Sequence, residues 1–421
     1  MRLSCFWSAQ GPAQLSRRTK LSGRIYFDHS ATTPLDPRVL EAMLPFLVES
    51  FGNASSQHAE GREARGAVET ARAQVAALLN ADANEIIFTG SGTEADNLAL
   101  IGAVRTSVGP THVITSPIEH AAILKTCEYL EESGVSVTQL PVDSDGLVDT
   151  LDLEAAFRPE TRIVSVMAAS NLVGTVQPIA ELAEITAEHG ALFHTDAVQA
   201  GGKVPIDVKS SPIDLVSLSA HKLHGPKGIG VLFVRRGVEL APIVLGGGQE
   251  RGLRSATENV AGIVGFGVAA EIARKEMDAE ATRLRNLREK IVRVLAQTVP
   301  QAYVIGHPEK RLPGHLSLAF AGQEVLAGRL VQLLDRAGVA VSAGSACNAH
   351  HADKPSHVLL AMGYDAERAR GLVRITLGRF NTETEVDRFL EILTGLVEEL
   401  NPDLDWTTSP QLAGPLQGVT V

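Results

Sequence analysis

Residues 86–95 have the sequence IIFTGSGTEA, in which a short apolar run is followed by small residues. Ile86–Thr89 is typical of a buried strand, and Gly90–Ala95 is typical of a turn that opens a helix. The free N–H groups at such a helix N-terminus stabilise a phosphate. The turn also fits the dinucleotide fingerprint G-x-G-x-x-A, but the next strand, His112–Thr115, lacks the acid expected after it. A tight turn without a ligand is the alternative.

Strand and helix patterns alternate from Pro37 to about Val234. The expected strands are Ile86–Thr89, His112–Thr115, Ile163–Ala168, Ala191–Thr195, Asp214–Leu218 and Val231–Val234. Helical patterns such as Gly66–Leu79 and Ile179–His189 lie between them. This alternation predicts βαβ units and a mainly parallel sheet.

The pattern changes after Arg254. A long helix is expected from about Asn259 to Ala296. Beyond it we expect three strands and two helices, at Leu316–Phe320, Val339–Ser342, Val373–Leu377, Glu324–Ala337 and Glu383–Leu400. This order is typical of a smaller α+β domain. We therefore expect a large domain over residues 37–265 and a small domain over residues 24–36 and 266–403.

The two ends of the chain differ from the rest. The first 24 residues carry five basic residues and no acidic one. We expect a disordered leader over residues 1–23, with a targeting peptide as the alternative. Residues 404–421 are rich in Ser, Pro, Gly and Gln, which predicts a disordered tail.

Bulk composition excludes several classes of protein. The 421 residues have a formal net charge of -11 and no basic stripe, so direct nucleic-acid binding is not expected. No apolar run is long enough to cross a bilayer. The three cysteines Cys5, Cys127 and Cys347 are too few for a disulfide framework. They fit a reducing compartment, so we expect a cytoplasmic enzyme in which Cys127 packs inside a helix.

Polar residues follow the expected strands at the edge where ligands of parallel sheets bind. They are Asn171, Asp196, Gln199, Ser219, His221 and Lys222. A carboxylate such as Asp196 can keep a pyridine nitrogen protonated, although an isolated Asp is often a helix N-cap. Lys222 can form a Schiff base, because partial burial frees its amine. A solvated surface lysine is the alternative.

These motifs resemble the class V aminotransferases, and within them the cysteine desulfurases of the NifS/IscS type. The resemblance runs from about Ile25 to Asn401. It rests on YFDHSATTP at 26–34, FGN at 51–53 with His58, TGSGTEADN at 89–97, IEH at 118–120, HTDAVQ at 194–199, SLSAHK at 217–222, RSAT at 254–257 and GSAC at 344–347. It implies the α/β fold type I of pyridoxal-phosphate-dependent transferases. That fold has a mainly parallel seven-stranded sheet in the large domain and a smaller α+β domain.

The resemblance implies pyridoxal 5'-phosphate as the cofactor, held by Lys222 as a Schiff base. Asp196 then pairs with the ring nitrogen, Gln199 reaches the ring hydroxyl, and His120 stacks on the ring face. The remaining cofactor contacts come from the phosphate-binding residues Gly92, Thr93, Ser219, His221 and, from the second subunit of a homodimer, Thr257. The large domain is thus the cofactor-binding domain.

The implied reaction converts L-cysteine to L-alanine, with Lys222 as the general base. Asn171 and Arg374 bind the substrate carboxylate, for which a planar guanidinium is well shaped. The thiolate of Cys347 takes the sulfur as a persulfide. The implied catalytic residues are thus Lys222, Cys347 and His120. A sulfur-acceptor protein, which the sequence does not identify, would receive it for iron–sulfur cluster assembly or thiolation. A selenocysteine lyase, another reaction of this fold or a non-catalytic scaffold are the alternatives.

One segment departs from the family. After Cys347 the chain reads NAHHADK over residues 348–354, about one residue longer than usual. His350 and His351 can promote formation of the thiolate, assist sulfur delivery or simply belong to a surface loop. A metal site with Cys347 is conceivable, but we expect none.

Overall fold

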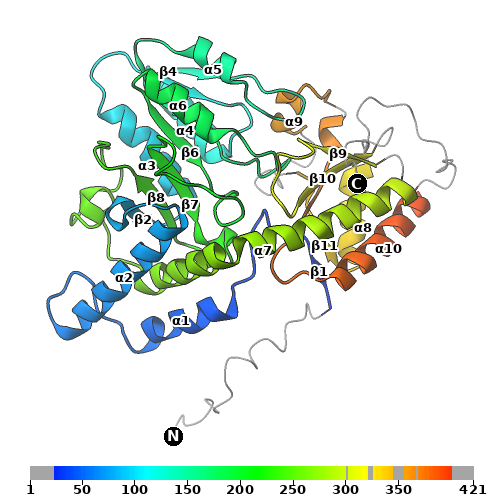
Figure 1. Ribbon diagram of the computed structural model, residues 1–421, viewed down its shortest axis with the longest axis horizontal. Helices are drawn as coiled ribbons and strands as arrows, with labels where there is room; N and C mark the ends of the chain where they lie inside the picture. Colours follow the sequence, from blue (N-terminus) through cyan, green and yellow to red (C-terminus); the bar gives the residue numbers. More distant parts are fainter. Residues whose placement is uncertain (1–22, 300–301, 321–325, 345–354, 367, 401–421) are drawn as a thin grey trace, which may run out of the picture.

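The computed structural model describes residues 23–299, 302–320, 326–344, 355–366 and 368–400. In Figure 1 the long helix α7 (Val260–Thr298) joins a larger part, built on a wide sheet, to a smaller part. The leader before residue 23, the loop that holds Cys347 and the tail after residue 400 lie outside the described residues. The predictions for those segments therefore stay predictions.

A seven-stranded sheet forms the centre of the larger part, in the order β2-β8-β7-β6-β5-β3-β4. The strands are β2 (Ile86–Thr89), β3 (His112–Thr115), β4 (Ser136–Gln139), β5 (Thr161–Ser165), β6 (Leu192–Asp196), β7 (Leu215–Ser219) and β8 (Gly230–Val234). The pairs from β7 to β4 are parallel, and β8 is antiparallel to both of its neighbours. The expectation of a mainly parallel, seven-stranded sheet is confirmed.

Helices cover both faces of this sheet, so its central strands are buried on both sides. Ile87 packs in one apolar core with α3 (Gly92–Arg105) and α4 (Ala121–Glu132). Its neighbours Ile86 and Phe88 belong to the opposite core, with α2 (Ala59–Leu78), α6 (Ile179–Glu188) and the first half of α7. Two more helices, α1 (Pro37–Val48) and α5 (Thr150–Ala156), pack on α7 and α6.

The smaller part has its own core. The antiparallel strands β9 (Ala302–Ile305), β10 (His315–Phe320) and β12 (Val373–Thr376) form one sheet, and β1 (Ile25–Tyr26) pairs in parallel with β11 (Val339–Ala340). The helices of this part are α8 (Leu326–Arg336), α9 (His357–Ala361) and α10 (Glu383–Leu400). Phe27, Ile291 and Phe389 lie in this second core, so residues near the N-terminus pack beside residues near the C-terminus.

Helix α7 takes part in both cores. Its residues up to Ala270 belong to the core of the larger part, and those from Leu284 onward belong to the second core. The domain boundaries near residues 37 and 265 stay a prediction. Although α7 has 39 residues, no helix within the described ranges is long and apolar enough to cross a membrane.

Several predicted boundaries are wrong, most of them by one residue, and three show why. Strand β5 ends at Ser165 rather than Ala168, although the N–H of Ala168 still donates to the carbonyl of Asp196 at 2.9 Å. Strand β11 ends at Ala340, because Ser342 pairs instead with Arg374 of β12. Helix α2 begins at Ala59 rather than Gly66, since the ring of His58 caps it.

A buried ion pair ties the loop after β8 to the sheet. Glu250 accepts hydrogen bonds from Arg72 of α2 at 2.7 and 2.8 Å and from the N–H of Phe88 in β2 at 2.8 Å. The Glu250 side chain is 5% exposed and that of Arg72 is 10% exposed. Because the loop continues to Thr257, this pair positions a segment that the sequence assigns to the cofactor.

Replacement of Glu250 by Gln is expected to lower the free energy of unfolding by about 3 kcal/mol, because the guanidinium of Arg72 then loses its buried partner and keeps the exposed one, Glu69. The measurement is the denaturation midpoint in urea. Glu128→Gln is the matched control, since its pair with Lys125 is exposed and such pairs contribute less than about 1 kcal/mol. Equal midpoints for the two variants would contradict the prediction.

Candidate active site

The predicted strand-end residues come from adjacent parallel strands. Asp196 is the last residue of β6, and Lys222 ends a short 3-10 turn, Ala220–Lys222, directly after β7. Strands β5, β6 and β7 are neighbours in the sheet, so their carboxyl ends meet at one edge. His120 follows β3 as the N-cap of α4, where its Nδ1 accepts from the N–H of Ala122 at 3.2 Å.

Asp196 forms a buried cluster with Asp96 of α3 and with His120. One oxygen of each carboxyl and one ring nitrogen of His120 all lie within 4.8 Å of one another. Burial raises the pKa of Asp196, and burial together with the charge of Asp196 raises the pKa of Asp96 well above its usual range. Two buried carboxylates repel each other, so a cation placed here stabilises the ionised form of Asp196.

Oxygen Oδ1 of Asp96 has no hydrogen-bond partner in the described part of the chain. It lies 3.8 Å from Nε2 of the buried His194. Because burial raises the pKa of Asp196, a protonated ring nitrogen beside that carboxyl would stabilise its ionised form. The arrangement therefore suits the pyridine ring that the sequence predicts.

A buried histidine of β6 holds the end of this strand against its two neighbours. His194 Nδ1 lies 2.8 Å from Ser165 Oγ of β5, and its Nε2 lies 3.0 Å from Ser217 Oγ of β7. Burial lowers the pKa of His194 to about 3, so the ring is neutral. His194 thus links β5, β6 and β7 two residues before Asp196, without adding a charge.

The turn after β2 is closely packed, as a phosphate-binding turn must be. Helix α3 begins at Gly92 after the N-cap Ser91, whose hydroxyl accepts from the N–H of Glu94 at 3.1 Å. A Cβ at Gly92 would lie 2.7 Å from Val198 Cγ2 and 3.4 Å from Ser219 Cβ, so the turn touches the ends of β6 and β7. Thr93, in the first turn of α3, is exposed.

Thr257 is also exposed, on the segment after Arg254. The guanidinium of Arg254 donates to Glu94 at 2.8 Å, which joins this segment to the turn. Both threonines are thus open to a ligand or to a second copy of the chain. No contact between them is present within the described residues.

Lys222 lies against the segment that follows β1. Its amine donates to the carbonyl of Ser30 and, at 2.9 Å, to that of Ala31. Gln199 Nε2 donates to the same Ser30 carbonyl at 2.9 Å. His221 Nδ1 lies 3.1 Å from Thr32 Oγ1, and burial lowers the pKa of His221 to about 4. The structure thus brings Lys222, Gln199 and His221 together around residues 30–32.

Arg374 is 1% exposed on β12, in the smaller part. Its guanidinium donates to Asp28 at 2.8 Å and to the backbone carbonyl of Asn171 at 2.9 Å. The amide side chain of Asn171 takes no part in this contact. Nitrogen Nε of Arg374 has no hydrogen-bond partner in the described residues. Arg374 and Asn171 are therefore brought together, but through the backbone of Asn171.

Other predicted residues lie elsewhere. Cys347, His350 and His351 lie outside the described residues, and Gly344, at the start of their loop, has a φ of 87°. Cys127 is buried in α4, where burial raises the pKa of its thiol to about 12. A thiol with that pKa is not a nucleophile, so the prediction of a packing role is confirmed.

The sequence reasoning missed two groups at the site. Asp96 is one, and the carbonyls of Ser30 and Ala31 are the other. A signal existed for Asp96, because it is a charged residue on a helix whose neighbours Ala95, Leu98 and Ala99 are apolar and buried. Nothing local predicts the carbonyls, since they lie more than 190 residues from Lys222 in the chain.

Comparisons with known proteins agree with this geometry. The model of the family described as "Aminotransferase class-V" matches residues 25–389. A "Cysteine desulfurase" of Gluconacetobacter diazotrophicus is 48% identical over 379 residues, covering 89% of this chain and 94% of that protein. "Cysteine desulfurase IscS 1" of Archaeoglobus fulgidus is 46% identical over 376 residues, covering 89% and 97%.

Solved structures of NifS-like proteins are also similar to this chain. A structure described as "NIFS-LIKE PROTEIN" superposes with a TM-score of 0.83 at 42% identity, covering 89% of this chain and 100% of that one. A NifS-like protein from Rickettsia africae gives a TM-score of 0.79 at 32% identity, covering 90% and 99%. With its strand-end lysine and buried carboxylate in place, the chain belongs to the class-V aminotransferase family.

Proposed function

We propose that this protein is a pyridoxal-phosphate-dependent cysteine desulfurase, which converts L-cysteine to L-alanine and takes the sulfur on Cys347. The observation that carries the proposal is the position of Lys222, directly after β7 and next to the strand that ends in buried Asp196. Relatives that are 46–48% identical and named cysteine desulfurases support the choice of substrate.

The residues that would hold the cofactor surround this point. Asp196 would pair with the ring nitrogen, Gln199 would reach the ring hydroxyl, and His120 would stack on the ring. The phosphate would be bound by Gly92, Thr93, Ser219 and His221, and by Thr257 of a second copy of the chain in a homodimer. When bound, the cofactor accepts the electron pair that is released at Cα of the substrate.

The protein's own groups would carry out the proton and sulfur transfers. Arg374 would bind the substrate carboxylate with two hydrogen bonds, and Asn171 would assist it. Lys222 would remove the proton from Cα. The Cys347 thiolate would then attack the substrate sulfur, so that an S–S bond forms and the Cβ–S bond breaks. Protonation of the carbon leaves alanine.

The carbonyls of Ser30 and Ala31 would hold the amine of Lys222 whenever it carries the proton. We propose that an acceptor protein takes the sulfur from Cys347, and that this protein belongs to iron–sulfur cluster assembly or a thiolation route. We also propose that the enzyme is cytoplasmic.

One substitution tests whether the turn after β2 binds the cofactor phosphate. A Cβ at Gly230 would lie 2.3 Å from the carbonyl carbon of Ser91 and 2.8 Å from the nitrogen of Gly92, so the turn must move. We expect Gly230→Ala to weaken cofactor binding at least tenfold, or about 1.4 kcal/mol. Gly66→Ala is the control, because a Cβ there meets nothing within 4 Å. Equal cofactor affinity of the two variants, measured by fluorescence titration, would count against a phosphate in this turn.

The proposed function is tested with the full chain, loaded with cofactor and given L-cysteine. Alanine must appear, and mass spectrometry must find one added sulfur atom on the peptide that contains Cys347. Alanine release from L-selenocysteine alone would identify a selenocysteine lyase instead. Neither product from either substrate would overturn the proposal.

A further inference from the structure

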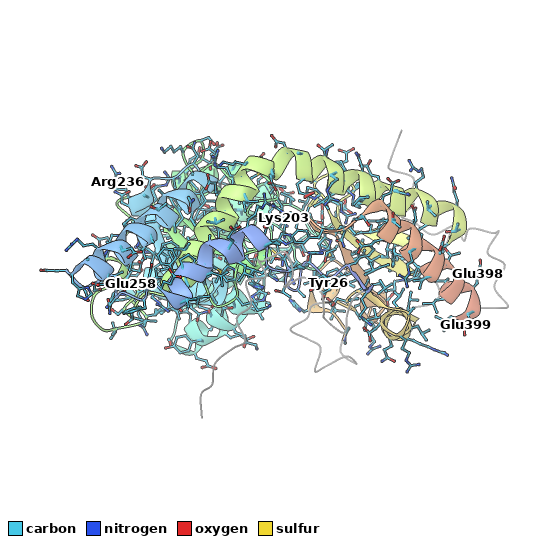
Figure 2. The ribbon with its side chains drawn as sticks, turned by 90° about the horizontal axis from the view of Figure 1, so that it is seen from below. Tyr26, Lys203, Arg236, Glu258, Glu398 and Glu399 are labelled. Carbon is cyan, nitrogen blue, oxygen red and sulfur yellow. The ribbon has the colours of Figure 1, made fainter. Side chains whose placement is uncertain are left out.

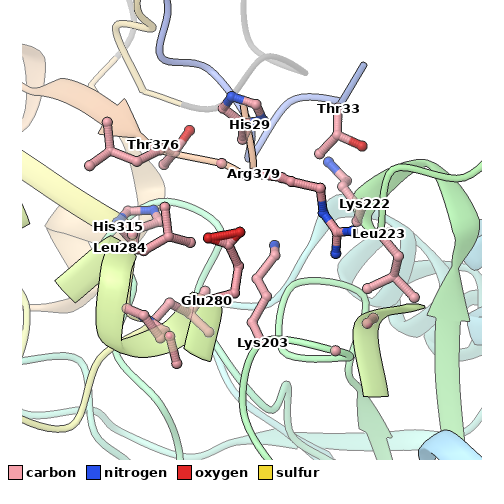
Figure 3. A pocket seen from close by; sticks show the side chains of 18 of the residues that line it. His29, Thr33, Lys203, Lys222, Leu223, Glu280, Leu284, His315, Thr376 and Arg379 are labelled. Atoms are coloured by element: carbon pink, nitrogen blue, oxygen red, sulfur yellow. The ribbon is translucent and has the colours of Figure 1, made fainter. Parts of the chain in front are cut away.

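A cavity lies behind Lys222, between the two parts of the molecule. It holds about 690 Å³ of space free of atoms, part of it open to solvent. Its walls come from the 3-10 turn that ends at Lys222, from the middle of α7 and from the ends of β10 and β12 (Figure 3). It shares with the proposed active site Lys222 and Ser30, whose carbonyl accepts from the Lys222 amine, but none of the other proposed cofactor and substrate contacts. The cavity therefore adjoins the proposed active site, and its remaining walls are distinct from it.

Lys203 brings a positive charge into this cavity. Figure 2 places Lys203 between the two parts, and Figure 3 shows its amine pointing into the space near Glu280. Its hydrogen bond is a long one, 3.5 Å to Gln199 Oε1. No carboxylate of the described residues lies within 4.0 Å of it to form an ion pair. The pKa of Lys203 is lowered to about 7, mainly by burial and to a smaller extent by the charge of Lys222.

The other charged groups of the lining are already neutralised. Arg379 pairs with Asp36 at 3.2 Å and with Glu276 at 2.6 Å. Glu280 of α7 pairs with Arg283. When Lys222 carries the cofactor, Lys203 is the cation of the described lining that has no ion-pair partner, its one hydrogen bond being the long one to Gln199. A buried charge without a partner is costly, so the cavity favours an anion with a single charge.

Three histidines also line the cavity, and all are neutral at physiological pH. Burial lowers the pKa of His29 to about 3 and that of His224 to about 4. Burial also lowers the pKa of His315 well below its usual range. They add hydrogen-bonding capacity without charge. The ring of His29 is buried, with only 4% of the residue exposed.

Much of the remaining wall is apolar, although Ser30, Thr33 and Thr376 add hydroxyl side chains. The apolar side chains that line it are Leu223, Ala273, Met277, Ala281, Leu284, Leu312, Pro313 and Leu377. A fully hydrated inorganic anion would gain nothing from this surface, whereas a short hydrocarbon chain would be buried on it. The lining thus combines one cationic end with an apolar chamber.

We propose that this cavity binds a small aliphatic monocarboxylate, with its carboxylate on the amine of Lys203 and its hydrocarbon chain against α7. A bound carboxylate stabilises the ammonium form of Lys203. Binding is therefore strongest below about pH 7 and weakens by about tenfold for each pH unit above it. The proposal does not depend on turnover, so it can fail while the desulfurase reaction stands.

The test is calorimetric titration of the cofactor-loaded full chain with pentanoate, and with pentan-1-ol and pentylamine as matched neutral and cationic probes. We expect pentanoate to bind one molecule per chain and pentylamine not to bind. Lys203→Met should weaken pentanoate binding at least tenfold, and Lys203→Arg should retain it. Lys209→Met is the control, because Lys209 pairs with Asp82 on the surface.

Saturating L-alanine, whose carboxylate occupies the proposed substrate site, must leave the affinity for pentanoate unchanged. Displacement by L-alanine would place pentanoate at Arg374 and overturn the proposal. Equal affinity of the wild type and Lys203→Met, or no binding of pentanoate at pH 6, would also overturn it. The thermal midpoint of each variant shows that the fold is intact.

Discussion

Lys222→Ala is expected to lower kcat for alanine formation from L-cysteine by at least about 10⁴-fold. Loss of a positioned general base alone costs about 10²- to 10⁴-fold. The same substitution removes the amine that would hold the cofactor covalently, which adds to that loss. Alanine release under single-turnover conditions measures the effect. Borohydride reduction followed by mass spectrometry should label Lys222 in the wild type and leave the variant unlabelled.

The fold should survive this substitution, since Lys222 is only half-buried and its two carbonyl partners can bind water instead. Far-UV circular dichroism checks this. Lys125→Ala is the control, because Lys125 is exposed on α4 and its ion pair is with the exposed Glu128. More than about one hundredth of the wild-type rate in Lys222→Ala would mean that another group is the base.

Cys347→Ala is expected to lower sulfide release from L-cysteine under reductant by on the order of 10³-fold or more, since loss of a nucleophile can cost an enzyme up to about 10⁶-fold. Binding of L-cysteine should persist, because the carboxylate would be held by Arg374.

The chain just before the Cys347 segment is hydrogen-bonded to that arginine. The N–H of Arg374 donates to Ser342 at 2.7 Å, and the N–H of Ser342 donates back at 3.1 Å.

A second thiol gives the control for this experiment. Cys127→Ala removes a thiol that is buried in α4 and whose pKa is raised to about 12, so it should lose some stability and keep sulfur transfer. Persulfide must be absent from Cys347→Ala and present in Cys127→Ala. A Cys347→Ala enzyme that releases sulfide at the wild-type rate would show that sulfur leaves by simple elimination.

Most of the architecture could be predicted from local patterns. The bounds of β2, β3 and α10 agree with the predictions, because an apolar run between turn residues, or a helical apolar period, is a property of neighbouring residues. Strands β4 and β9 were not predicted. Strand β4 lies at the edge of the sheet and has no buried residue, so it lacks the apolar signal of a strand.

Local sequence pattern was enough to predict three features of the site: a phosphate-type turn at Gly90–Ala95, a carboxylate at the end of β6 and a lysine after β7. Their types and their order along the strands follow from local pattern. The surroundings of these groups, by contrast, come from the way distant segments pack together. The carboxyl of Asp96 beside Asp196, the carbonyls around the amine of Lys222 and the cavity at Lys203 are contacts between distant segments. Their energies depend on burial and on charge separation, which no local pattern specifies.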